Sequence, residues 1–260
     1  MSLFNVYPLY DVTPVRAKDV YVYDDKGVEY LDLYGGHAVI SIGHSHPNYV
    51  KAITNQVSSL GFYSNAIQNP IQAELAKRLE EVSGCYGYQL FLCNSGAEAN
   101  ENALKLASFK TNKARVIAFN NGFHGRTSAA VAATDNPSIN APINLQQKVT
   151  FIALNDIEGV KRELEKGDVC AVIVEFIQGV GGLDQGTAEF FEQVDGLCKL
   201  NNTFFIADEV QSGYGRSGKF FACEHAGIWP DFLTLRGIVG CHTTTKLAHS
   251  MHPHSLVFWQ

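Results

Sequence analysis

Short, continuous runs of apolar residues alternate with segments of helical periodicity from about Pro47 onward, and this alternation constrains the fold more than any other feature. The runs read YQLFLC, RVIAFN, VTFIAL, CAVIVEF and TFFIADE, and NPIQAELAKRLEEVSG is one of the helix-period segments. Apolar strands separated by helices indicate a mostly parallel sheet with helices on both faces, so we predict an α/β fold. With 260 residues, 46% of them hydrophobic, the chain can bury such a core.

The N-terminal segment has a different pattern. DVYVYDDKGVEYLDLYGG alternates apolar and polar residues around an Asp-Lys-Gly turn, which predicts a β-hairpin from Val20 to Leu33. We expect residues 1–46 to belong to a smaller domain and residues 47–235 to form the large α/β domain, incomplete as it stands. Residues 236–260 form a tail with no clear apolar period, and four of the chain's nine histidines lie in it.

Charge and composition argue against several classes of function. The formal net charge of −6 and the lack of a Lys/Arg run disfavour binding of nucleic acid. No stretch of about 18 uncharged apolar residues occurs, and the N-terminus lacks the pattern of a signal peptide, so we expect a cytoplasmic protein with no membrane partner. The six cysteines form no Cys-x-x-Cys pair, which favours reduced thiols over disulfides.

Residues that follow the predicted strands are the first candidates for a site, because ligands bind at the carboxyl ends of strands in open α/β sheets. After QLFLC, Asn94 or Ser95 can cap a helix whose first turn carries Gly96 and Ala97. The free N–H groups and the positive end of the helix dipole can hold a phosphate there. An ordinary strand-to-helix turn would explain the same residues, so this segment alone does not decide.

Two further strand ends carry a ring and charged groups. After RVIAFN, Phe123 offers a flat face to a planar ring and Arg126 offers a fork that matches a carboxylate. A surface turn with a core phenylalanine is the alternative for that segment. Glu175 lies at the end of the run CAVIVEF, where a buried carboxylate needs a partner. A solvated strand end is the alternative for Glu175.

Asp208 and Glu209 follow the last apolar run directly. The alternation of side chains along a strand points one of the two acids toward the site face and the other away. An acid there can pair with a protonated ring nitrogen, as in enzymes that use pyridoxal phosphate as an electron sink. Val210 would then pack on the ring and Gln211 would hydrogen-bond its phenolic oxygen. A solvent-exposed acidic strand end is the alternative.

Together the strand ends supply a phosphate seat, a ring stack, a carboxylate clamp and a ring-nitrogen partner for one ligand. The segments that carry a resemblance to a family are YLDLYGGHAVISIGHSHP, LGFYSN, NSGAEANENALKLA, FHGRTSAA, EFIQGVGG and DEVQSGYGRSGKFF. Through them, over roughly residues 5–235, the chain resembles the class III, fold type I pyridoxal phosphate-dependent aminotransferases. Within that family it is most similar to the branch that uses N-acetylornithine or N-succinylornithine in arginine biosynthesis.

The resemblance implies a role for each candidate residue. The cofactor, pyridoxal 5′-phosphate, would be bound by Ser95, Gly96, Ala97, Phe123, Asp208, Val210 and Gln211. The substrates would be bound by Arg126, Glu175 and His37. These substrates would be an N-acylornithine and 2-oxoglutarate or glutamate, and the full-length enzyme would be a homodimer. Family members often read Glu-Pro-Ile-Gln-Gly-Glu-Gly-Gly where this chain has Phe176 and Val180.

The resemblance ends near Leu235. Family members continue into an Ala-Lys-Gly segment whose lysine forms the Schiff base with the cofactor, whereas this chain has Arg236 and Gly237 there. A guanidinium stays protonated and is a poor nucleophile, and Lys246 lies nine residues beyond Gly237 without family context. We therefore expect a C-terminally truncated chain with an aberrant tail, without a catalytic lysine and without transaminase activity as written.

Other interpretations remain open. The tail histidines His242, His249, His252 and His254 could bind a metal, but nothing near them supplies a fixed geometry, so we expect no metal site. An alternative function is a lysine-less protein that binds pyridoxal phosphate or dimerises without catalysis. A nucleotide-binding α/β domain is the least favoured, because NSGAEANENA offers no group to bind a ribose.

Overall fold

The computed structural model describes residues 1–2, 4, 7–64, 66–237 and 240–245. It divides the chain into two compact units, Met1–Asn69 and Pro70–Gln260. Each unit is described by itself below. From the sequence we expect a boundary between residues 46 and 47, which separates the small and large domains of the family. That boundary stays a prediction.

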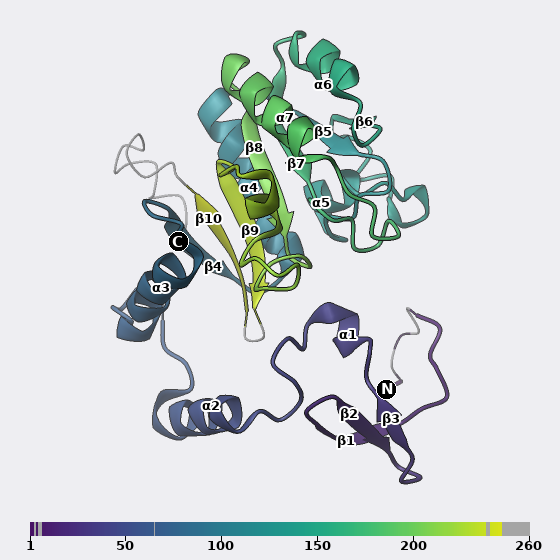
Figure 1. Cartoon of the computed structure of the whole chain (residues 1–260), viewed down its shortest axis with the longest axis vertical. Coiled ribbons are helices and arrows are strands. Elements are labelled where there is room, and N and C mark those ends of the chain that lie inside the picture. Colours follow the sequence, from purple (N-terminus) through teal and green to yellow (C-terminus); the bar gives the residue numbers. More distant parts are fainter. Residues whose placement is uncertain (3, 5–6, 65, 238–239, 246–260) are drawn as a thin grey trace. The chain divides into compact units, whose positions relative to one another are not determined.

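The unit Met1–Asn69 contains a small antiparallel sheet. Its strands are β1 (Pro14–Lys18), β2 (Tyr21–Asp24) and β3 (Glu29–Leu31), and β2 pairs with both neighbours (Figure 1). Strands β2 and β3 form the predicted hairpin, with Gly27 in the left-handed region at φ 80°. The turn is closed by the carboxylate of Asp24, which accepts hydrogen bonds from the backbone N–H groups of Lys26 and Val28. The prediction of a hairpin is confirmed.

Two helical segments complete this unit, α1 (Gly35–Ala38) and α2 (Pro47–Leu60). Within α1, Gly36 and His37 have left-handed backbone angles, with φ values of 57° and 59°. Glycine adopts this region without strain, whereas a histidine there is uncommon. Residue 37 therefore lies in a local turn that the surrounding chain must stabilise.

The unit Pro70–Gln260 is built on a seven-stranded sheet with the order β4-β10-β9-β8-β7-β5-β6. Its strands are β4 (Gln89–Cys93), β5 (Arg115–Phe119), β6 (Val149–Ile152), β7 (Val169–Val174), β8 (Phe204–Glu209), β9 (Phe232–Gly237) and β10 (Gly240–Thr245). All pairs among strands β5 to β9 are parallel. Strand β10 is antiparallel to both of its neighbours, β4 and β9. The five apolar runs are strands β4 to β8, so the predicted mostly parallel sheet is confirmed.

Part of the segment expected to be an aberrant tail lies in this sheet. Residues 236 and 237 end β9, and residues 240–245 form β10, whose Cys241 pairs with Arg236 of β9 and Cys93 of β4. Strand β10 thus connects β4 to the parallel strands (Figure 1). Residues 246–260, including Lys246 and three of the tail histidines, lie outside the described residues.

The helices of this unit cover both faces of the sheet. They are α3 (Pro70–Ser83), α4 (Gly96–Thr111), α5 (Ser128–Ala132), α6 (Ile157–Leu164) and α7 (Ala188–Leu200), with 3₁₀ turns at Pro137–Ile139 and Ala222–Ala226. Ile206 of β8 packs in a core with Ala103 and Leu104 of α4. Its neighbour Phe205 packs in a second core with Phe190 of α7. Successive side chains of one strand therefore enter opposite cores, as expected for a sheet buried on both faces.

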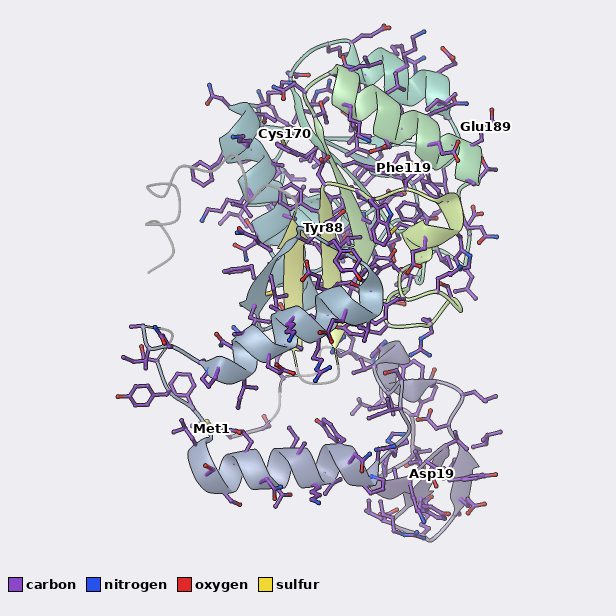
Figure 2. All side chains as sticks on the ribbon, turned by 60° about the vertical axis from the view of Figure 1, so that its left-hand side comes forward. Met1, Asp19, Tyr88, Phe119, Cys170 and Glu189 are labelled. Carbon is purple, nitrogen blue, oxygen red and sulfur yellow. The ribbon has the colours of Figure 1, made fainter. Side chains whose placement is uncertain are left out.

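The side-chain view agrees with this packing. Phe119 and Cys170, each 1% exposed, lie inside the sheet unit, whereas Glu189 lies at its surface (Figure 2). None of the helices in the described part of the chain is long and apolar enough to cross a bilayer.

Candidate active site

The N-terminus of α4 follows β4 directly and is prepared to bind an anion. Ser95 is the N-cap residue, with extended backbone angles, and its Oγ accepts a hydrogen bond of 3.1 Å from the N–H of Glu98. The Glu98 carboxylate in turn accepts a hydrogen bond of 2.7 Å from the N–H of Asn94. The N–H groups of Gly96 and Ala97 point out of the first turn, where no helical acceptor exists, so they are available to a phosphate.

Contacts at three glycines show that the predicted strand ends meet. A Cβ atom built on Gly96 would lie 2.7 Å from Cγ1 of Val210. One built on Gly125, in the turn after Phe123, would lie 2.7 Å from Cβ of Ala97. The segments after β4, β5 and β8 therefore converge around one place.

The third of these glycines joins the segment after β7 to the same place. A Cβ atom on Gly179 would overlap the side-chain amide of Gln211, which therefore lies directly against the Gly179 backbone. Each of these three contacts depends on the lack of a side chain at the glycine.

Asp208, at the end of β8, is a buried carboxylate with specific partners. It is 3% exposed, and its Oδ2 atom lies 2.8 Å from Nδ1 of His124 and 2.7 Å from Nδ2 of Asn100. Its Oδ1 atom accepts a hydrogen bond of 3.1 Å from the N–H of Val210. Since a carboxylate only accepts, the hydrogen in the pair with His124 must sit on Nδ1.

The neighbouring acid points to the other face of the sheet, as the alternation predicts. Glu209 is fully buried, and its carboxylate accepts hydrogen bonds from the hydroxyl of Ser212 and from the N–H groups of Ala222 and Cys223. Burial raises the pKa of Glu209, although these donors oppose the shift. Glu209 therefore anchors the segment after β8, while Asp208 faces the site.

Glu175, just after β7, lies on the same face as Asp208. Its carboxylate accepts a hydrogen bond of 2.8 Å from the N–H of Phe123 and one of 3.3 Å from the N–H of Gly179. The side chain is 4% exposed. Burial raises the pKa of Glu175 to about 7, with the charge of Asp208 acting in the same direction and the charge of His124 opposing it. Glu175 can therefore take up or release a proton near neutral pH.

His124 connects the two acids electrostatically. Its side chain is 1% exposed, and its backbone N–H donates to Oγ1 of Thr134 over 2.9 Å. Burial lowers the pKa of His124, but the hydrogen bond and the charge of Asp208 together outweigh burial, so that the pKa lies above its ordinary value. A cationic imidazole next to Asp208 keeps that carboxylate in an ionic pair.

The predicted site residues differ in burial and position. Asp208 and Glu175 are buried, and Arg126 is exposed in the turn before α5. Those of intermediate burial around the converging turns are Ser95, Gly96, Ala97, Phe123, Val210 and Gln211. His37 belongs to the unit Met1–Asn69, where its ring lies 4.9 Å from that of Tyr34. Its predicted part in substrate binding stays a prediction.

Sequence reasoning gave no role to Asn100, Thr234 or His124. Asn100 lies four residues after Gly96, so it projects from the same face of α4 one turn later. Thr234 is the one hydroxyl residue in the apolar segment FLTL of β9. Each was a weak signal, because only the tertiary contacts show that the two polar side chains meet Asp208.

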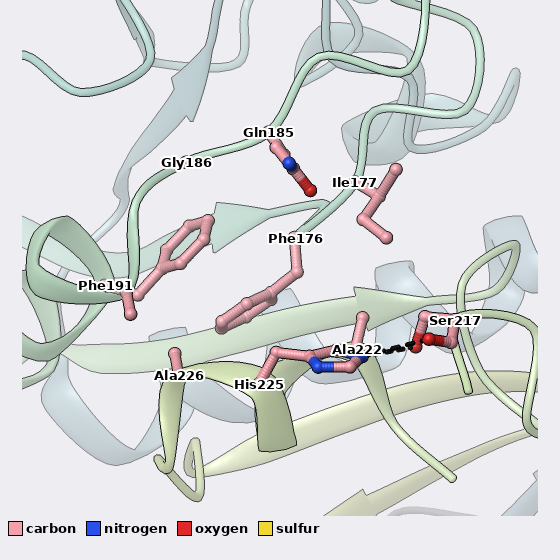
Figure 3. A pocket seen from close by; sticks show the side chains of 10 residues that line it. Phe176, Ile177, Gln185, Gly186, Phe191, Ser217, Ala222, His225 and Ala226 are labelled. Carbon is pink, nitrogen blue, oxygen red and sulfur yellow. Dashed lines mark hydrogen bonds between the residues drawn. The ribbon is translucent and has the colours of Figure 1, made fainter. Parts of the chain in front are cut away.

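A cavity of about 420 Å³ lies elsewhere (Figure 3). Phe176 and Phe191 line it with ring centroids 4.0 Å apart, and at its rim Nε2 of His225 lies 3.2 Å from Oγ of Ser217. Phe176 and Phe191 belong to the core on the α7 side of the sheet, whereas Asp208 bonds to Asn100 of α4 on the other side. The cavity is therefore separate from the site around Asp208.

Metal binding finds no support in the described part of the chain, where no group of three or more His, Cys, Asp or Glu side chains could hold an ion. The alternative of a site in the tail concerned His249, His252 and His254, which lie outside the described residues, and His242, whose side chain is not described.

Comparisons with known proteins identify the family. The family model described as Aminotransferase class-III matches residues 5–240. The chain belongs to the class III aminotransferases. It is 41% identical over 235 residues to an acetylornithine aminotransferase of Bacillus subtilis (strain 168), covering 90% of this chain and 60% of that protein.

Solved structures agree with this family. The ornithine aminotransferase of Toxoplasma gondii ME49 has a TM-score of 0.88 at 28% identity, covering 96% of this chain and 63% of that one. The taurine:2-oxoglutarate aminotransferase of Bifidobacterium kashiwanohense, solved in complex with PLP and glutamate, has a TM-score of 0.81 at 25% identity, covering 94% of this chain and 62% of that one. The chain thus spans about three fifths of the length of each of these three proteins.

Family and fold together confirm two of the predictions. The fold is that of the fold type I pyridoxal phosphate transferases, and the family is one of pyridoxal phosphate-dependent transferases. The residues present fit this cofactor. The first turn of α4 offers free N–H groups to a phosphate, Gly96 and Gly179 leave room beside Val210 and Gln211, and a buried carboxylate stands ready for a basic ring nitrogen.

Proposed function

We propose that this chain carries the cofactor-binding part of an aminotransferase of arginine biosynthesis. The enzyme moves the terminal amine of N-acetylornithine or N-succinylornithine to 2-oxoglutarate, giving glutamate. The observation that carries the proposal is the buried carboxylate of Asp208, held by His124 and Asn100 beside the N-terminus of α4. The choice of substrate rests on the similarity to the acetylornithine aminotransferase of Bacillus subtilis.

The cofactor pocket is assembled from the converging turns. Ser95 orders the first turn of α4, and the N–H groups of Gly96 and Ala97 bind the phosphate. Asp208 would accept a hydrogen bond from the protonated ring nitrogen, and a fixed carboxylate at that place would favour the charged form of the nitrogen. When bound, pyridoxal phosphate supplies a carbonyl carbon that takes up the amine and a ring that withdraws electrons from the reacting carbon.

Phe123, Val210 and Gln211 complete the pocket around the ring. Phe123 and Val210 enclose the ring between the segments after β5 and β8. The amide of Gln211, which rests on Gly179, binds the phenolic oxygen. Together these residues would hold the ring in the pocket.

Substrate binding is assigned to three residues outside that pocket. The exposed guanidinium of Arg126 binds a carboxylate of the acylated ornithine, because its planar fork matches the two oxygens. Glu175 has a pKa of about 7, and its carboxylate accepts a hydrogen bond from the backbone N–H of Phe123. It can therefore change its charge as the substrate amine enters. His37 contributes to the choice of the acyl group.

The 260-residue chain as written binds the cofactor without turning over substrate. Transamination needs an amine that can lose its proton and then carry the proton between two carbon atoms. Arg236 stands where the family's lysine is expected, and its guanidinium performs neither step. The second candidate function is therefore a cofactor-binding protein without catalysis. The sequence Thr-Leu-Arg-Gly at residues 234–237 favours it for the 260-residue chain.

A chimera with a relative tests the proposal. Residues 1–235 are joined to the C-terminal part of the Bacillus subtilis relative that lies beyond the matching position, where the family is expected to carry its Schiff-base lysine. The chimera and the 260-residue chain are each supplied with pyridoxal phosphate, 2-oxoglutarate and one amine donor, and glutamate is measured. We expect the chimera to use N-acetylornithine or N-succinylornithine in preference to free ornithine. A chimera that fixes the cofactor with borohydride but uses neither acylated donor would contradict the proposal.

Two further features expected from the sequence stay predictions. They are the cytoplasmic location and the homodimer formed by the full-length enzyme. Sedimentation of the chimera at micromolar concentration tests the second, and a monomer there would argue against it.

A further inference from the structure

Asn100 is enclosed between the ends of β8 and β9. Its side chain is 1% exposed, and Nδ2 lies 2.7 Å from Oδ2 of Asp208 and 2.7 Å from the carbonyl oxygen of His124. On the other side, Oδ1 lies 2.7 Å from Oγ1 of Thr234, which is fully buried. Asn100 therefore uses both ends of its amide within one small cluster.

The orientation of this amide follows from the chemistry of its partners. Both atoms next to Nδ2 are oxygens that only accept, a carboxylate and a carbonyl. Reversing the amide would place its oxygen against two oxygens and its nitrogen against a hydroxyl, so the assigned orientation is the stable one. Because Oδ1 has no hydrogen, the hydroxyl of Thr234 donates to it. Hydrogen bonds thus run in one direction, from Thr234 through Asn100 to Asp208.

This arrangement makes the two oxygens of Asp208 different. Oδ2 accepts from both Asn100 and His124. Oδ1 accepts only from the N–H of Val210, because the single hydroxyl hydrogen of Thr234 is already given to Asn100. The separation of 3.5 Å between Oγ1 of Thr234 and Oδ1 of Asp208 is then no second bond. Within the described part of the chain, Oδ1 keeps one acceptor site free.

The backbone fixes the members of this cluster. Asp208 and Thr234 are direct partners in the register of the parallel strands β8 and β9. Asn100 lies in the second turn of α4, whose first turn carries the phosphate seat. The place of the carboxylate is therefore set relative to the N-terminus of α4 by a side chain of α4 itself, that of Asn100.

We propose that Asn100 and Thr234 are positioning residues that saturate Oδ2 of Asp208 and thereby present Oδ1 to the protonated ring nitrogen of the cofactor. This inference rests on the proposed function, because it needs a ligand with a basic ring nitrogen. Both residues act through Asp208 rather than by contact with the cofactor. Loss of either one leaves Asp208 bound to His124 and to the N–H of Val210 but holds the orientation of its carboxylate less firmly, so the specific preference for a ring nitrogen decreases.

Thr234→Val is the sharpest variant, because valine keeps the shape of threonine and removes only the hydroxyl. The probes are pyridoxamine 5′-phosphate, which has no aldehyde to react with lysines, and its 1-deaza analogue, in which C–H replaces the ring nitrogen. Dissociation constants are measured by fluorescence titration of the 260-residue chain. One lost hydrogen bond predicts binding of pyridoxamine phosphate weakened about tenfold and binding of the deaza analogue changed less than about twofold.

Two matched variants control for a merely structural effect. Thr203→Val removes the hydroxyl of another buried threonine, which donates to the carbonyl of Val169 away from Asp208, and should change neither affinity by more than about twofold. Thr234→Ser keeps the hydroxyl and should restore the preference for the ring nitrogen. Asn100→Leu should abolish that preference, and it also lowers stability because the buried carbonyl oxygen of His124 loses the donor that Asn100 supplies.

The results distinguish a failure of the cofactor assignment from a failure of the positioning role. If the unmodified chain binds both probes equally, the ring nitrogen has no partner and the proposed function fails together with the positioning role. If the unmodified chain prefers pyridoxamine phosphate and Thr234→Val keeps the full preference, or weakens both probes equally, the positioning role is wrong while the cofactor assignment stands.

Discussion

The Nδ1 atom of His124 lies 2.8 Å from the Oδ2 atom of Asp208, and the two side chains are 1% and 3% exposed. A pair this deeply buried is stable only while both partners are present, because removal of one leaves a desolvated charge. Asn100, in the second turn of α4, donates hydrogen bonds to both residues, to the backbone carbonyl of His124 and to the carboxylate of Asp208. The same buried pair therefore contributes to the stability of the fold and fixes the position of the Asp208 carboxylate.

His124→Phe should destabilise the protein through this pair. The variant leaves the Asp208 carboxylate with one side-chain donor, and we expect the free energy of unfolding to fall by about 3 kcal/mol. Urea denaturation followed by tryptophan fluorescence measures this value. His225→Ala, at an exposed histidine, is the control and should change it by less than about 0.5 kcal/mol. Equal effects of the two variants would refute a structural role for the pair.

Glu175 should make stability depend on pH. Its pKa is about 7 in the folded protein and near 4.5 when the chain is unfolded, so the folded state holds one more proton between these values. Stability from this group is complete below about pH 4.5 and is lost as pH rises toward 7, by an amount of order 3 kcal/mol.

The window from about pH 5 to pH 6.5 excludes the contribution of His124, because the raised pKa of His124 acts above its ordinary value. Glu209, whose pKa is also raised by burial, gives a slope of the same sign there, so the comparison with Glu175→Gln identifies the part that belongs to Glu175. Over this window the free energy of unfolding should fall with pH in the unmodified chain, and Glu175→Gln should remove part of that slope. An identical pH slope in the variant would show that Glu175 ionises normally.

Gly96→Ala should weaken cofactor binding. The new Cβ atom would lie 2.7 Å from Val210 and would push that side chain out of place beside the first turn of α4. We expect the dissociation constant for pyridoxamine phosphate to rise at least about tenfold. Gly196→Ala is the control, because nothing lies within 4 Å of its new methyl group. Alanine in the middle of α7 should instead stabilise the protein by about 0.5–1 kcal/mol and leave the affinity unchanged.

Phe176→Ala should lower stability strongly and affect the cofactor site little. Phe176 is 3% exposed and packs on Phe191 and Phe205 with centroid distances of 4.0 and 6.1 Å. Loss of its ring should cost about 3–4 kcal/mol of unfolding free energy. Leu200→Ala, at an 84% exposed end of α7, should cost little. A small effect of Phe176→Ala would mean that the neighbouring side chains move in and fill the space that the ring leaves.

Local signals in the sequence were sufficient for most of the fold. Each of the strands β4 to β8 is a continuous apolar run, and the hairpin of β2 and β3 has a turn with Gly27 at a positive φ. Strand β10 was not predicted, because GCHTTT has no apolar run and its place between β4 and β9 depends on pairing over a long distance in the chain. Local patterns do not contain such pairing.

The site was predictable where it depends on strand ends and less so where it depends on the interior. Asp208 and Glu175 follow apolar runs, so their place at the carboxyl edge of the sheet was visible in the sequence. Asn100 and Thr234 lie inside a helix and a strand, where a polar residue is ordinary until its tertiary partners are known. The network that holds Asp208 is therefore a result of the structure.

The most direct test of the central claim is the protonation state of the cofactor's ring nitrogen. Pyridoxamine 5′-phosphate labelled with ¹⁵N in the ring is bound to the 260-residue chain, and its nitrogen resonance is followed as pH rises. If Asp208 pairs with this nitrogen, the bound ring should stay protonated well above the pH at which the free cofactor loses its proton, and Asp208→Asn should abolish the difference. A bound cofactor that titrates like the free one in the unmodified chain would contradict the account.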